Sequence, residues 1–186
     1  MKTKCFHSVL RSSVLGPLLL VMKTLLLLRH AKSSWDSPAL RDFERPLNER
    51  GLKAAPLMGR FLLKRKIRPG LVLSSPAERA RQTAALLMEA ARLGCPLRFD
   101  ERIYEATAAR LVEVVSQVEE EVETVLVVGH NPGMEELIER LTGEVRRMPT
   151  AALARITLDI EKWGKLREGA GRLEELIKPK ELSTED

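Results

Sequence analysis

The chain has 186 residues, 31% of them charged and 44% hydrophobic, which predicts one domain with a substantial core. The formal net charge of +5 invites a nucleic-acid-binding function, but three basic residues and no acidic residue lie in positions 1–21. The rest of the chain is nearly neutral, and the composition therefore argues against a nucleic-acid partner.

The first 21 residues differ in composition from the rest. They combine a basic start with a short apolar patch, yet no small-residue cleavage site of a secretory signal follows. The apolar run is interrupted at Lys23 and is too short for a membrane-spanning helix. We expect a natural start at Met22, with residues 1–21 a disordered or mis-annotated extension, residues 22–178 the domain, and residues 179–186 a flexible tail.

Cysteine and metal-ligand patterns add little. Cys5 and Cys95 are too few for a disulfide framework, and no cluster has the spacing of a metal site. We therefore expect a cytoplasmic protein without metal or other cofactor and without membrane attachment. The sequence indicates no particular oligomeric state.

The body of the chain alternates short apolar runs with helical patterns, as in α/β proteins. After a strand at 24–28, Asn48 can cap a helix that runs to about residue 66. One face of this helix is predicted to carry Leu52, Ala55, Gly59 and Leu62. The remaining predicted strands are 71–73, 97–99, 124–128, 153–160 and 172–177, the last two resembling edge strands, and the remaining helices are 75–93, 108–118 and 131–141.

The helix after the second strand carries a capping signature. Ser75 takes the cap position, Pro76 the first helical position and Glu78 the third, where its side chain reaches back to the cap. The inward face of this helix is predicted to consist of Ala80, Ala84, Leu87 and Ala91.

Two of the three histidines directly follow apolar runs that read as buried parallel strands. Arg29-His30 ends the run 25–28, and Gly129-His130 ends the run 125–128. In an open α/β sheet, ligands bind in the crevice beyond the carboxyl ends of the strands. Two imidazoles placed alike, one beside an arginine, predict a site for an anion that one histidine attacks.

Further donors are expected at the same edge of the sheet. Arg79 lies in the first turn of the helix capped by Ser75, and helical side chains lean toward the N-terminus, whereas Arg81 is expected on the surface. The forked donors of Arg29 and Arg79 suit phosphate oxygens. The helix that begins at Asn131 adds free amides and its positive dipole end. This set of groups favours a phosphoryl site over a carboxylate site.

Three motifs in this order resemble the histidine phosphatase superfamily. They are Arg29-His30-Ala31, then Ser74-Ser75-Pro76 followed by Arg79-Ala80 and Gln82-Thr83-Ala84, and then Gly129-His130-Asn131-Pro132-Gly133. The residues after the first histidine, Ala31-Lys32-Ser33 with Asp42, Arg45-Pro46-Leu47 and Arg50-Gly51, look like the SixA-like branch of phosphohistidine phosphatases. The resemblance covers the chain from Met22 to about Pro179. It implies a phosphoglycerate mutase-like fold, a single three-layer α/β/α domain with a mostly parallel central sheet.

The resemblance also implies a mechanism without a metal. His30 would be the nucleophile and would form a transient phosphohistidine that water hydrolyses. Arg29, Arg79 and His130 would hold the phosphoryl oxygens, and Asn131 at the adjacent helix start would be a further phosphate-binding residue. An imidazole must be neutral to attack, and the two arginines favour that form.

The general acid is left open by the sequence. Glu105 falls in the segment where the superfamily often places a carboxylate, Glu101 is a nearby competitor, and Glu105 could equally be a solvated loop residue. Phosphohistidine has a better leaving group than an ester and depends less on an acid. Lys32, Ser33 and Asp42 could contact substrate or stabilise the loop after the nucleophile.

The short connections between the predicted elements favour an open pocket. Such a pocket would admit a phosphohistidine on a protein partner, which is the favoured substrate. A small phosphorylated metabolite hydrolysed with Glu105 as general acid is the alternative. A phosphate-binding module without turnover is the third possibility, but binding alone does not require a nucleophile such as His30.

Overall fold

The computed structural model describes residues 22–35 and 39–182, and the predicted extension 1–21 lies outside them. Its centre is a six-stranded sheet in the order β3-β2-β4-β1-β5-β6. The strands are β1 (Lys23–Arg29), β2 (Leu71–Ser74), β3 (Leu97–Phe99), β4 (Thr124–Gly129), β5 (Leu153–Leu158) and β6 (Gly171–Ile177). The four strands β1, β2, β3 and β4 are parallel to one another, and β5 runs antiparallel to both of its neighbours, β1 and β6. The mostly parallel α/β sheet is thus confirmed.

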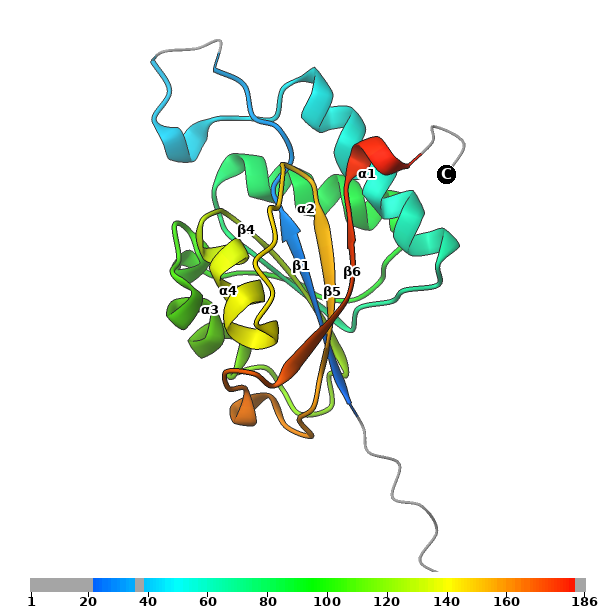
Figure 1. Ribbon diagram of the computed structural model, residues 1–186. Helices are drawn as coiled ribbons and strands as arrows, with labels where there is room; N and C mark the ends of the chain where they lie inside the picture. The colour runs from blue at the N-terminus through cyan, green and yellow to red at the C-terminus, as the bar shows by residue number, and fades with distance from the viewer. Residues whose placement is uncertain (1–21, 36–38, 183–186) are drawn as a thin grey trace, which may run out of the picture.

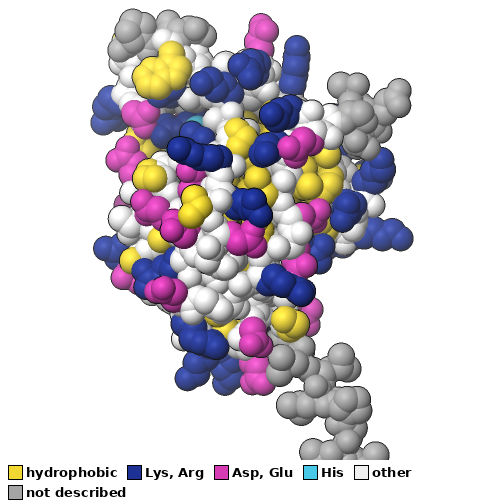
Figure 2. Space-filling model, in the orientation of Figure 1, with side chains coloured by type: hydrophobic (Ala, Val, Ile, Leu, Met, Phe, Trp, Pro, Cys, Tyr) yellow, Lys and Arg dark blue, Asp and Glu magenta, His cyan; other side chains and the backbone are white. Residues whose placement is uncertain are grey.

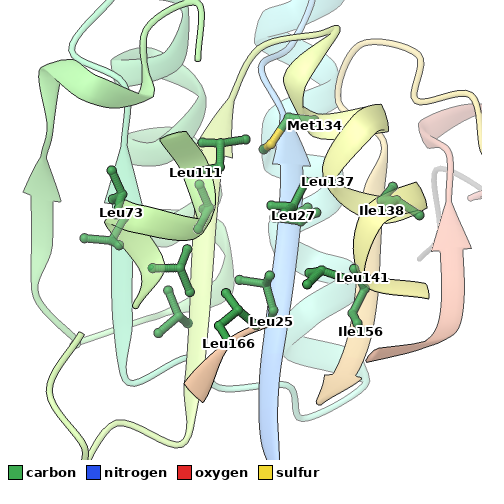
Figure 3. Packing of buried hydrophobic residues seen from close by; sticks show 14 of the residues in the cluster. Leu25, Leu27, Leu73, Leu111, Met134, Leu137, Ile138, Leu141, Ile156 and Leu166 are labelled. Atoms are coloured by element: carbon green, nitrogen blue, oxygen red, sulfur yellow. The ribbon is translucent and has the colours of Figure 1, made fainter. Parts of the chain in front are cut away.

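Two helices cover each face of the sheet (Figure 1). They are α1 (Glu49–Lys64) and α2 (Glu78–Ala91) on one face, and α3 (Ala108–Val115) and α4 (Gly133–Thr142) on the other. Side chains of β1 alternate between the faces, so that Leu25 and Leu27 pack against α3 and α4 (Figure 3), whereas Leu26 and Leu28 pack against α1 and α2. All four leucines are fully buried, which explains the uninterrupted apolar run of a strand with helices on both sides.

α1 begins as predicted, but its buried face is rotated. The Asn48 side chain accepts a hydrogen bond from the Gly51 amide, which confirms the cap. Ala55, Gly59 and Leu62 are buried, whereas Leu52 is 47% exposed, so its assignment to the inward face is wrong. The buried stripe runs through Gly51, Ala55, Met58 and Leu62. Leu52 is one position beyond Gly51, so its side chain points about 100° away from this stripe around the helix axis.

The capping box predicted at Ser75 is wrong. α2 begins at Glu78 behind Ala77, which has no capping side chain, while Ser75 is a buried residue directly after β2. The Ser75 hydroxyl lies 3.3 Å from the Ala77 amide and 2.8 Å from a ring nitrogen of His130. The predicted inward face of α2, Ala80, Ala84, Leu87 and Ala91, is confirmed, because all four residues are buried.

Other boundaries differ by a few residues. α3 ends at Val115 rather than near residue 118, and α4 begins at Gly133 rather than Asn131. β6 is an edge strand as expected, but β5 lies inside the sheet between β1 and β6. Beyond Lys178, where the tail was predicted to begin, a 3-10 helix (Pro179–Glu181) follows and Leu182 packs against the core, while residues 183–186 lie outside the described part. None of the helices in the described ranges has the length and apolar character needed to cross a membrane.

Candidate active site

The two histidines predicted to share a site meet beyond the ends of neighbouring strands. Arg29 ends β1 opposite Gly129, which ends β4, and the His30 amide donates to the Gly129 carbonyl at 3.0 Å. The ring centroids of His30 and His130 are 5.0 Å apart. The parallel pairing of β1 with β4 therefore brings together residues that are a hundred positions apart in the sequence.

His30 has a protonated and an unprotonated ring nitrogen. Its Nδ1 lies 2.7 Å from the Ala31 carbonyl oxygen, which only accepts, so Nδ1 carries the proton and Nε2 keeps its lone pair. Burial, together with the positive charges of Arg79 and Arg29, lowers the pKa of His30 to about 4 despite the opposing hydrogen bond to Ala31. At neutral pH this imidazole is uncharged, with Nε2 as a potential nucleophile.

Arg79 connects both imidazoles to a carboxylate. It is buried at the second position of α2. Its Nε donates toward Nε2 of His30 at 3.4 Å, and its Nη2 lies 3.3 Å from Nδ1 of His130. Its Nη2 also donates to Asp42 Oδ2 at 2.8 Å, and its Nη1 donates to the Asp42 carbonyl. The prediction that Arg79 faces the crevice while Arg81 is exposed agrees with this geometry.

His130 is held between Arg79 and Ser75. Because an arginine can only donate, Nδ1 of His130 accepts from Arg79, and Nε2–H donates to the Ser75 hydroxyl at 2.8 Å. Burial, with the neighbouring His30 and Arg79, lowers the pKa of His130 to about 3. The Tyr104 ring lies edge-on to His130, with 5.4 Å between ring centroids.

A close backbone approach places the Tyr104 segment beside the start of α4. At Gly133 a Cβ atom would collide with the carbonyl oxygen of Ala106, so only glycine permits this contact. The Asn131-Pro132-Gly133 sequence therefore matters for packing as well as for the helix start.

Asp42 is a member of the site that sequence reasoning left open. It lies in a 3-10 helix, η1 (Asp42–Glu44), and its carboxylate accepts from Arg79, from Arg45 at 2.9 Å and from the Tyr104 hydroxyl at 2.9 Å. Burial tends to raise the pKa of Asp42, but hydrogen bonds from Tyr104 and Arg79 and the charge of Arg79 outweigh it, and the pKa lies below its usual range. Asp42 is therefore an anion at neutral pH.

Arg45 holds the loop that carries Asp42. Its buried guanidinium donates to the Ser33 hydroxyl and the Ser34 carbonyl, and it stacks on Trp35 with its Cζ 3.3 Å from the ring centroid. Arg45 also pairs with Asp42, and the only sign of this ion pair in the sequence is the three-residue spacing between them.

Arg29 and Asn131 are both anchored to the same carbonyl. Arg29 Nη1 donates to the Met148 oxygen at 2.7 Å, and Asn131 Nδ2 donates to that oxygen at 3.1 Å and to Glu135 at 2.7 Å. The positive charge of Arg29 contributes to the lowered pKa of both histidines. The Asn131 amide group, in contrast, is turned toward Met148 and Glu135, so the structure does not aim its donors at the two imidazoles.

The two candidate acids have no direct contact with the histidines or with Arg79. Glu105 and Glu101 are exposed, and neither makes a hydrogen bond or ion pair with His30, Arg79 or His130. Glu105 has a φ of 47°, so its backbone adopts the left-handed conformation just after Tyr104. A role for Glu105 as general acid stays a prediction. Across residues 22–35 and 39–182, no three His, Cys, Asp or Glu side chains are grouped so that they could hold a metal ion.

Comparison with known proteins agrees with this geometry. A family model described as the histidine phosphatase superfamily (branch 1) matches residues 25–108. The chain is similar to the crystal structure of the putative phosphohistidine phosphatase SixA from Agrobacterium tumefaciens, with 32% identity, a TM-score of 0.73, and coverage of 84% of this chain and 98% of that chain. A structure of the protein histidine phosphatase SixA complexed with tungstate is also similar, with 27% identity, a TM-score of 0.71, and coverage of 86% and 99%.

Among curated sequences, the chain is similar to an uncharacterized protein of Mycobacterium tuberculosis. The two are 39% identical over 105 residues, which are 56% of this chain and 63% of the relative. The match therefore spans less than two thirds of that protein.

Proposed function

Because this chain belongs to the histidine phosphatase superfamily, we propose that it is a phosphohistidine phosphatase that moves a phosphoryl group from a protein partner to His30 and then to water. The observation that carries the proposal is the state of His30. This imidazole is neutral, its Nδ1–H is held by the Ala31 carbonyl, and its Nε2 lone pair faces Arg79 in a crevice.

Binding of the phosphoryl group would use the cationic side of this crevice. Arg79 donates through Nε and both Nη atoms, and exchanging Asp42 for a phosphoryl oxygen would keep its hydrogen bonds satisfied. When Arg79 turns to the phosphoryl group, the Ser75 hydroxyl can donate to Nε2 of His130 instead of accepting. The single ring proton of His130 is then on Nδ1 instead of Nε2, and Nδ1–H can donate to a second phosphoryl oxygen.

The chemistry takes two displacements at phosphorus. In the first, Nε2 of His30 forms a bond to phosphorus while the bond to the substrate imidazole breaks. That imidazole, protonated at its other ring nitrogen, leaves as a neutral ring with the electron pair of the broken bond. In the second, water attacks phosphorus, the bond to His30 breaks, and inorganic phosphate leaves as the neutral imidazole is restored. Preorganised donors at the phosphoryl oxygens typically contribute ~10²–10³ in rate each.

The surroundings of the leaving group favour phosphohistidine over an alkyl ester. An alkoxide requires a proton donor, which is worth ~10²–10⁴ in rate when positioned. Asp42 has a lowered pKa and is therefore ionised, and Glu105 is exposed without a contact to the cluster. An imidazole leaves at much lower cost than an alkoxide, so this site needs no further acid for phosphohistidine.

The proposal is tested by trapping the intermediate. Wild-type protein and His30→Ala are each mixed with a radiolabelled histidine-phosphorylated peptide and quenched in alkali. We expect acid-labile label on the wild type and none on His30→Ala, which should also lack turnover. Turnover by His30→Ala at the wild-type rate would overturn the role of His30.

The leaving-group argument is tested by comparing substrates. Phosphohistidine and an aryl phosphate should be hydrolysed faster than an alkyl phosphate such as phosphoglycerate, and Glu105→Gln should leave the first two rates unchanged. If alkyl phosphates are preferred and Glu105→Gln abolishes their turnover, the protein is a metabolite phosphatase with Glu105 as its acid.

A further inference from the structure

A groove with a volume of about 1370 Å³ opens next to the catalytic crevice. Arg29, Asn131 and Pro132 line the end nearest to the two histidines, and α1 forms one side. The segment around Met148 and the residues after β6 complete the lining. The volume exceeds the ~300–1,000 Å³ typical of pockets for small molecules, so a single phosphorylated metabolite would leave much of the groove empty.

The charges along this groove are strongly one-sided. Eight Lys and Arg side chains line it, and Glu135 is the one acidic residue among the described residues of the lining. Glu135 lies 3.9 Å from Arg147, so it offsets at most part of this charge. On α1, Arg50, Lys53 and Arg60 are exposed and make no ion pair within the described ranges. Because the chain beyond position 21 is nearly neutral, this concentration of cations is local to the groove.

The groove also has apolar lining residues. Ala54, Pro56 and Leu57 of α1 are among them, together with Pro132, Pro149 and Pro179. In Figure 2, Lys and Arg side chains gather over the upper part of the view, with hydrophobic side chains exposed between them. A lining that combines apolar residues with many cations matches an amphipathic protein segment whose polar side is acidic.

We propose that this groove binds an acidic, amphipathic segment of the protein substrate that flanks the phosphorylated residue. The proposal rests on the proposed function, and it adds the region of the substrate that is recognised. The phosphoryl group would lie at the end of the groove marked by Arg29, and the flanking segment would extend along α1 toward Lys178. The described lining has no aromatic residue on which bases could stack, which argues against single-stranded nucleic acid as the occupant.

Binding is measured first, without any phosphoryl chemistry. Two fluorescein-labelled, unphosphorylated peptides of equal length are compared by anisotropy, one patterned with Glu and Leu and the other with Lys and Leu. The wild type should bind the acidic peptide in preference, more weakly as salt increases, and Lys53→Glu combined with Arg60→Glu should weaken this binding about tenfold.

A matched control reverses two charges elsewhere. Lys162 and Arg167 are exposed in the connection between β5 and β6, at the opposite end of the sheet from His30. Lys162→Glu with Arg167→Glu should bind the acidic peptide like the wild type. The proposal would be overturned if both double variants lost binding equally, or if the wild type bound the two peptides equally. It would also be overturned if a single-stranded oligonucleotide displaced the labelled peptide more easily than unlabelled acidic peptide does.

Catalysis then separates the groove from the chemistry. With histidine-phosphorylated forms of both peptides, the wild type should show a higher kcat/KM for the acidic one through a lower KM. The α1 double variant should lose this preference and still hydrolyse an aryl phosphate at the wild-type rate. Selective binding of the acidic peptide without hydrolysis of either phosphopeptide would refute the proposed function and retain the groove. Equal hydrolysis of both phosphopeptides without selective binding would refute the groove proposal and retain the proposed function.

Discussion

At the scale of single residues, Arg79 is the side chain that connects the two histidines with Asp42. Its guanidinium reaches His30, His130 and Asp42 from the first turn of α2. Arg81 is two residues further along the same helix and lies 3.8 Å from Glu78 on the exposed side. The two arginines therefore form a natural pair for comparison.

Replacement of Arg79 should separate catalysis from surface charge. Arg79→Ala removes donors from both the nucleophile and the phosphoryl site, and we expect kcat/KM for an aryl phosphate to decrease by ~10²-fold or more. Arg81→Ala should remain near the wild-type rate. Similar small effects of both substitutions would show that Arg79 does not contact the substrate.

Asp42 should oppose anion binding. Its ionised carboxylate holds the guanidinium that we assign to the phosphoryl group. Asp42→Asn removes one negative charge beside the site, and tungstate should then inhibit at about tenfold lower concentration. Asp159→Asn, an exposed change between β5 and β6, is the control and should leave inhibition unchanged. Weaker inhibition of Asp42→Asn would mean instead that Asp42 orients Arg79 for binding.

At the scale of elements, α1 packs tightly on α2, the helix that carries Arg79. The two helices are in close contact at Gly59, where a Cβ atom would collide with the carbonyl oxygen of Leu87 and the methyl group of Ala90. Neither obstacle is the end of a flexible side chain, so a side chain at this position requires the helices to separate.

Gly59→Ala should therefore destabilise the fold. We expect the free energy of unfolding to decrease by about 1–3 kcal/mol, as for other overpacked sites, in urea titrations followed by circular dichroism. Gly94→Ala is the matched control, because a Cβ atom there meets no other atom within 4 Å. If the two variants are equally stable, the α1–α2 contact is less tight than described.

At the scale of the whole molecule, the two neutral histidines, one half-buried and one buried, connect the site to stability. Burial lowers the pKa of His30 to about 4 and that of His130 to about 3, from the ordinary value of 6.5. Between these values and 6.5 the unfolded chain binds protons that the folded chain does not. The free energy of unfolding is therefore unaffected by the titration of these two groups above pH 6.5, and it decreases as the pH falls from 6.5 toward their pKa values in the folded protein.

Urea unfolding at pH 7.5 and pH 5 measures this effect. The wild type should be less stable at pH 5, and His130→Gln should show a smaller decrease because one titrating group is gone. Carboxylates remain largely ionised over this interval, so they contribute little to the difference. An identical decrease in His130→Gln would indicate that His130 is not held neutral in the folded protein.

The sequence by itself determined the strands, the fold class and the positions of the main candidate residues. The run at 25–28 has the local signal of a strand buried on both faces, and the structure buries all four leucines. Because His30 and His130 follow such runs directly, their placement at one edge follows from strand ends, which are local features. Arg79 was placed by its position in the first turn of a helix expected to be capped by Ser75; the helix begins later, at Glu78, but Arg79 still lies in its first turn.

Tertiary structure alone decided which partners these residues meet. β4 lies between β1 and β2, and this order brings His130 to the Ser75 hydroxyl, which local pattern had assigned to a helix cap. The contact of Asp42 with Arg79 joins segments 37 positions apart, and the cationic groove joins α1 to the end of β6. Periodicity and capping rules describe neighbours along the chain, whereas these hydrogen bonds and this charge pattern depend on how distant segments pack in space.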